Sequence, residues 1–137
     1  DWTVVPSRWL LKGRVRNGVP EVKARIVAQQ LNDGTWMNAY SNTPSWTALA
    51  ITILWAQAHD FVLLPGDISV AFLYAHWPPE NKVLLLPPAD LREPGVYWEP
   101  LRAIYGLRPS PKLFNQQFAA DLQDLGFVRN RAEPQLF

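Results

Sequence analysis

The sequence contains no cysteine. Disulfide bonds and thiolate-bound metals are therefore excluded, which is compatible with a reducing compartment. Long apolar runs are also absent: the longest, residues 48–58, is interrupted by Thr52 and Gln57 and is too short to cross a bilayer. No signal-peptide pattern is present. We therefore expect an intracellular protein, cytoplasmic or nuclear, that does not bind a membrane.

Apolar residues and prolines are plentiful. Apolar residues make up 48% of the 137-residue chain, which argues against global disorder and is enough for the core of one modest domain. Proline-containing turns at 78–79, 87–88 and 109–111 divide the chain into short strand-like and helix-like segments. These segments follow no regular βαβ order, so we expect an α+β fold.

Positive charge is concentrated at the start of the chain. Residues 1–30 contain six lysines and arginines and two acids, whereas the remainder contains seven lysines and arginines and ten acids. A basic segment on a nearly neutral protein is typical of a local anion site, for example for nucleic acid or phosphate. It is equally typical of a solvated hairpin whose charges maintain solubility, and charge alone does not separate the two.

This basic segment has the pattern of a β-hairpin. Residues 8–16 and 22–29 are strand-like and flank Asn17-Gly18, a pair that strongly favours a tight hairpin turn. Side chains alternate between the two faces of a strand, so Lys23 and Arg25 should project side by side from one face.

The rest of the chain predicts short elements joined by turns. Thr43 followed by Pro44 is typical of a helix start, with the hydroxyl as cap and the proline in the first turn. We expect a loop over 30–42, a helix from there to about 59, a strand over 61–65, a helical turn over 70–75, a strand over 83–86, a helix from a Ser110 cap to a Gly126 stop, and the start of a strand at 135–137.

Asp67 stands directly after the apolar run 61–64 and a Pro-Gly pair. If that run is a buried strand, an unpaired carboxylate at its end is costly to keep charged. Either Asp67 caps a turn, which is the commoner role of such an acid, or a cation meets it there.

Four segments occur in an order that resembles the reverse transcriptase of copia-type retrotransposons. They are KARIVA at 23–28, GDISVAFL at 66–73, AIYGLRPSPKLF at 103–114 and QLF at 135–137. The resemblance runs from about Ser7 to Phe137. It implies a single partial reverse transcriptase domain over 1–137, with a fingers hairpin and loop at about 7–42, palm and fingers elements at about 43–137, and truncation before the Tyr-x-Asp-Asp hairpin.

The resemblance implies an RNA-directed DNA polymerase that adds deoxynucleotides to a primer 3′-hydroxyl by a two-metal mechanism. Asp67 matches the family's first catalytic, metal-binding aspartate, and the backbone carbonyl of Ile68 would be a further ligand for Mg²⁺ or Mn²⁺. The implied partners are an RNA or DNA template-primer, deoxynucleoside triphosphates and the rest of the retrotransposon polyprotein. The implied location includes a cytoplasmic virus-like particle.

Further positions match the family's nucleotide-binding residues. Lys23 and Arg25 match the finger residues that hold the incoming triphosphate. Phe72 matches the residue whose ring lies under the nucleotide sugar and selects deoxynucleotides, and Tyr105-Gly106 matches the segment beside the nucleotide and template. Without the resemblance, Phe72 and Tyr105 are equally typical of core residues.

The sequence departs from the family in lacking a Tyr-x-Asp-Asp motif, so only one of three expected metal-binding aspartates is present. We therefore expect weak metal binding and no polymerase activity by this chain alone. The alternative is a catalytically dead remnant that acts at most as a nucleic-acid-binding or structural domain. A third possibility is an unrelated α+β interaction domain.

Overall fold

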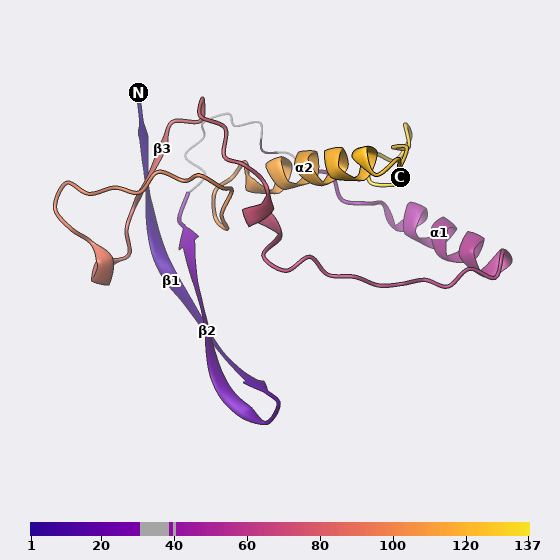
Figure 1. Ribbon diagram of the computed structural model, residues 1–137, viewed down its shortest axis with the longest axis horizontal. Coiled ribbons are helices and arrows are strands. Elements are labelled where there is room, and N and C mark those ends of the chain that lie inside the picture. The colour runs from indigo at the N-terminus through magenta and orange to yellow at the C-terminus, as the bar shows by residue number, and fades with distance from the viewer. Residues whose placement is uncertain (31–38, 40) are drawn as a thin grey trace.

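The computed structural model describes residues 1–30, 39 and 41–137. Within that part of the chain, a three-stranded mixed sheet of order β2-β1-β3 is combined with two α-helices and two short 3₁₀ helices. The α+β class expected from the sequence is confirmed. Figure 1 shows three parts: a long hairpin that projects from the sheet, helix α2 beside the sheet, and helix α1 at the end of an extended arm.

The hairpin consists of β1 (Thr3–Arg16) and β2 (Val19–Ala28), which pair antiparallel in continuous register up to Arg16 opposite Val19. The two turn residues have positive φ angles, 51° at Asn17 and 78° at Gly18. Two such residues make the turn whose twist matches that of the strands. The predicted hairpin is therefore confirmed, and its first strand begins five residues earlier than expected.

The first four residues of β1 pair with a different strand from the rest of β1. Strand β3 (Val83–Leu86), also predicted, pairs parallel with Thr3–Pro6, and the Ser7 hydroxyl donates a 2.8 Å hydrogen bond to the Leu86 carbonyl. The buried core lies where β1 and β3 meet, away from the hairpin tip. Its members are Val5, Ala28, Ala75, Trp77, Val83, Leu85, Ala103 and Leu107.

Helix α2 (Ser110–Asp124) packs its first turn against this core through Leu113 and Phe114. The prediction that Ser110 caps this helix was wrong. Ser110 is already helical and fully buried, and its hydroxyl donates a 2.6 Å hydrogen bond to the Ile104 carbonyl instead. The predicted stop at Gly126 is confirmed, because this glycine has a φ of 91° directly after the helix.

The short helices complete the described elements: η1 (Ala71–Tyr74), where a helical turn was predicted, and η2 (Ala89–Leu91). Helix α1 (Trp46–Ala58) begins two residues later than predicted. Its cap is Ser45 and not Thr43, because the Ser45 hydroxyl accepts a 3.1 Å hydrogen bond from the Ala48 N–H.

Helix α1 exposes most of its large apolar residues. Trp46 is 86% exposed, and only the small residues Ala48 and Ala56 are buried. The helix is apolar around most of its circumference, so its sequence does not determine which side packs against the rest of the protein. In Figure 1 it lies away from the sheet, connected to η1 by an extended segment.

Two predicted strands were wrong. Residues 61–65 are extended but exposed and belong to no sheet among the described residues, with Leu64 88% exposed. An apolar extended segment becomes a strand only where a neighbouring strand satisfies its backbone groups. Residues 135–137 fold back within their own loop, since the Leu136 carbonyl accepts a 2.8 Å hydrogen bond from the Asn130 N–H.

Val70 adopts an unfavourable backbone conformation immediately before η1. Its φ of 52° and ψ of 37° lie in the left-handed region, which a β-branched residue rarely adopts. Asparagine tolerates this region. We expect Val70→Asn to raise the free energy of unfolding by about 1 kcal/mol, measured as an increased urea midpoint. The matched control is Val62→Asn, an exposed valine with no positive φ, and an equal gain there would contradict strain as the cause.

Candidate functional site

The candidate site lies at the end of β2, where the segment that includes Tyr105 and Gly106 runs along the strand's outer edge. The Ala28 N–H donates a 2.8 Å hydrogen bond to the Tyr105 carbonyl. Gly106 has a φ of 88°, and a Cβ built on it would lie 2.8 Å from the Ala28 carbonyl carbon and closer still to its oxygen. The close backbone approach therefore requires glycine at this position.

Two aromatic rings meet beside this edge. Phe72, in η1, and Tyr105 have ring centroids 4.5 Å apart at an interplanar angle of 48°, and Phe72 also contacts Phe114 at 6.2 Å. Both separations are typical of favourable aromatic pairs. Phe72 is only partly buried against the core. The same ring can therefore pack against the core and leave part of its surface for a ligand, so the two roles considered from the sequence are compatible.

The guanidinium of Arg25 lies over the Tyr105 ring, with its Cζ 5.5 Å from the ring centroid. This is cation–π geometry, and it holds the side chain against the aromatic pair. The Nε of Arg25 is buried and has no hydrogen-bond partner among the described residues. A buried, unsatisfied donor is costly, so a ligand that offers an acceptor here would remove that cost.

A cavity of about 360 Å³ opens beside the Arg25–Tyr105 pair. Its other walls include Trp9, Val70 and Leu73, so it is apolar apart from the guanidinium and the phenol. Apolar walls with a few polar groups are typical of small-molecule sites. Val70 and Leu73 were not predicted as site residues, although both belong to the same GDISVAFL segment as Phe72.

Lys23 lies on the same face of β2 as Arg25, two residues nearer the hairpin tip, as predicted. It contacts neither aromatic ring; its direct cross-strand neighbour is Lys12. Two lysines in opposed positions repel each other. Lys23 and Lys12 thus place further positive charge on the hairpin, nearer its tip than Arg25.

Asp67 and Ile68 lie in the exposed extended segment before η1. The premise that Asp67 ends a buried strand was wrong, because no strand forms there. In the described parts of the chain, no group of three histidines or acids is placed to hold a metal ion. Mg²⁺ prefers six oxygen ligands, so one carboxylate and one carbonyl on an exposed segment do not make a magnesium site by themselves.

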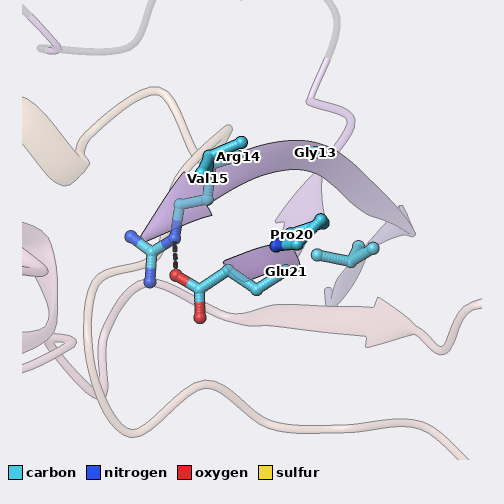
Figure 2. Close-up of a pocket in the computed structure, with 6 residues that line it drawn as sticks. Gly13, Arg14, Val15, Pro20 and Glu21 are labelled. Atoms are coloured by element: carbon cyan, nitrogen blue, oxygen red, sulfur yellow. Dashed lines mark ion pairs between the residues drawn. The ribbon is translucent and has the colours of Figure 1, made fainter. Parts of the chain in front are cut away.

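A second cavity, of about 450 Å³, lies at the hairpin tip (Figure 2). Figure 2 shows Arg14 and Glu21 joined by an ion pair across the two strands, with Gly13, Val15 and Pro20 beside them. The ion pair neutralises the charged groups of this cavity. It therefore offers less binding chemistry than the Arg25–Tyr105 cluster.

No described helix is long and apolar enough to cross a bilayer. Comparisons of the chain with protein-family models, curated proteins and solved structures found no match.

Proposed function

We propose that the chain is the fingers and the first part of the palm of a copia-type reverse transcriptase, and that Arg25, Phe72, Tyr105 and Gly106 form part of its deoxynucleoside triphosphate site. The observation that carries this proposal is the contact of Arg25 with the Tyr105 ring and of that ring with Phe72. Its three residues come from three of the segments that resemble the family, and they are neighbours in space although up to 80 residues separate them in the chain.

Each of these residues has a physical role in the proposed site. Arg25 presents several donors in one plane, which suits the oxygens of a triphosphate. Lys23 adds a second positive charge on the same face. Gly106 allows the backbone at 105–106 to lie against β2, and this contact positions the Tyr105 ring under the guanidinium.

Phe72 would supply selection between sugars. Its ring is fixed from two sides by Tyr105 and Phe114, so it has little freedom to move away from a substituent on the ligand. The 2′-hydroxyl of a ribose lying against this ring would clash with it, whereas a deoxyribose would not.

The binding test uses the whole 137-residue chain and a fluorescently labelled dATP, measured by anisotropy. Arg25→Gln should weaken dATP binding by at least about tenfold, because a charged hydrogen bond contributes about 1.5–3 kcal/mol. The matched control is Arg131→Gln, an exposed arginine in the loop after α2, which should leave the affinity unchanged. Equal effects of the two variants, or no dATP binding by the native chain, would overturn the proposed site.

Selection between sugars has its own expected result. Unlabelled dATP should compete with the labelled nucleotide better than ATP does, and Phe72→Ala should bring the two competition constants within about twofold of each other. The ratio is the informative quantity, because a loss of core packing by this variant would weaken both nucleotides alike. An unchanged ratio would remove Phe72 from the specificity role.

A further inference from the structure

A polar cavity of about 200 Å³ lies beside helix α2. Its walls come from three segments: residues 41–42, the first two turns of α2, and the loop that follows α2. Every side chain that lines it is polar: two cations, four amides and one hydroxyl. None is acidic, and none belongs to the cavity beside Arg25 and Tyr105.

Helix α2 supplies three of the lining side chains from one face. Lys112, Asn115 and Gln116 are three and four positions apart, which places them together on the helix surface. Leu113 and Phe114, which lie between them in the sequence, pack against the core. The same two turns of α2 therefore direct apolar side chains to the core and polar side chains to this cavity.

Arg129 reaches the cavity from the loop after α2 and is held there by that loop. Its Nε donates a 2.6 Å hydrogen bond to the Pro134 carbonyl, and its Cζ lies 5.7 Å from the centroid of the Phe137 ring. With Nε engaged, the two Nη groups at the end of the guanidinium remain to meet a ligand. A side chain that is already held loses little rotational freedom when a ligand binds.

The opposite wall is also fixed by hydrogen bonds. The side-chain amide of Asn115 donates to the Ser41 hydroxyl and, at 3.3 Å, to the Asn42 carbonyl. These bonds connect residues 41–42 to α2. Because both walls are held by contacts within the chain, the cavity is formed before any ligand enters, as is usual for small-molecule sites.

The two cations of this cavity lack a counter-charge. Lys112 and Arg129 are half-buried, and neither forms an ion pair in the part of the chain that the structure describes. Glu133 belongs to the same loop as Arg129, but it does not line the cavity, and its carboxylate accepts a 3.3 Å hydrogen bond from the Ser45 N–H. Two positive charges partly removed from water at one cavity repel each other, and an anion between them would offset that cost.

We propose that this cavity binds a small organic dicarboxylate, with one carboxylate at Arg129 and the other at Lys112. The two cations come from different segments, which suits a ligand with two separate anionic groups. The end of a guanidinium matches the two oxygens of a planar carboxylate. The volume equals that of roughly seven waters at about 30 Å³ each, more than a single phosphate or sulfate would fill.

The proposal does not rest on the triphosphate site, because the two cavities share no residue. Its test titrates succinate into the whole ¹⁵N-labelled chain at constant ionic strength and follows the amide signals by NMR. Saturable shifts should concentrate at the lining residues, including the side-chain amides of Asn115, Gln116 and Gln135. Acetate, which carries one carboxylate, should bind at least about tenfold more weakly, because it forgoes one charged contact.

Two variants test the cavity itself. Gln116→Glu adds a negative charge to its wall and should weaken succinate binding at least about tenfold. The matched control is Gln123→Glu, the same change at an exposed position of α2 outside the cavity, which should keep the native affinity. Lys112→Gln should also weaken binding about tenfold, whereas Lys112→Arg should retain it. The affinity for labelled dATP should be unchanged in all of these variants.

Succinate shifts that do not saturate, or that spread over exposed cations elsewhere, would overturn the proposal. So would an equal loss of affinity in Gln123→Glu, which would indicate net charge as the cause. Phosphate binding more tightly than succinate would assign the cavity to an inorganic oxyanion, and displacement of succinate by a 20-nucleotide oligothymidine would assign it to nucleic acid. If Gln116→Glu loses the native spectrum, Lys112→Gln decides, and native affinity in that variant would contradict the site.

Discussion

Gly106→Ala should destabilise the fold by at least about 3 kcal/mol, a large share of the 5–15 kcal/mol that is typical of a whole domain. Two costs add at this position. The φ of 88° is unfavourable for any side chain, and the new methyl group would overlap the Ala28 backbone. The neighbouring atoms cannot yield, because they belong to β2, which is fixed by its pairing with β1.

A matched glycine separates the two costs. Gly95 also has a positive φ, 75°, but nothing lies within 4 Å of a Cβ built on it. Gly95→Ala should therefore show only the backbone cost, about 1 kcal/mol. Urea denaturation followed by circular dichroism measures both variants, and the difference between them gives the overlap with Ala28. Equal stabilities would show that the 105–106 segment does not lie against β2 in solution.

The second large effect concerns catalysis: this chain alone should extend no primer on an RNA or DNA template with Mg²⁺ and all four deoxynucleotides. Two-metal nucleotidyl transfer depends on carboxylates that hold both ions at the attacking and leaving oxygens, a contribution of several kcal/mol. Among the described residues, Asp67 belongs to no group of three acids or histidines that could hold a metal ion, and the sequence has no Tyr-x-Asp-Asp motif.

Primer extension on a denaturing gel measures this directly. Asp67→Ala is the decisive comparison. This variant, like the native chain, should form no product, and its affinity for labelled dATP should equal that of the native chain. Product formed by the native chain and lost in Asp67→Ala would show that the exposed segment assembles an active metal site. A large loss of dATP affinity in Asp67→Ala would place the aspartate in the nucleotide site.

The sequence predicted best the elements whose determinants are local. The Asn17-Gly18 turn and the alternation along residues 22–28 are sufficient for the hairpin, and Gly126 for the end of α2, because each acts through its own backbone geometry. The strand expected at 61–65 failed for the opposite reason. Its apolar run satisfies the local pattern, but a strand also needs a neighbouring strand, and a local pattern contains no information on that neighbour.

In the candidate site, too, some features could be predicted from the sequence and others could not. Motif order placed Arg25, Phe72 and Tyr105 together in one hypothesis, and in the structure the three side chains do lie together. Their proposed roles in nucleotide binding stay predictions. Chain periodicity alone contained no signal for the unsatisfied Arg25 Nε or for the left-handed conformation of Val70.

The division of β1 between two partners has a consequence for how the chain folds. Its pairing with β2 joins neighbours in the sequence, and isolated hairpins of this kind form in about 1–10 μs. Its pairing with β3 joins residues about 80 positions apart, from Thr3 to Val83, and must await closure of the intervening chain. The core forms only at this second step. The rate of folding should therefore respond to changes at Val83–Leu86 and be insensitive to changes at the hairpin tip. The β1–β2 hairpin would form before the core to which it is attached.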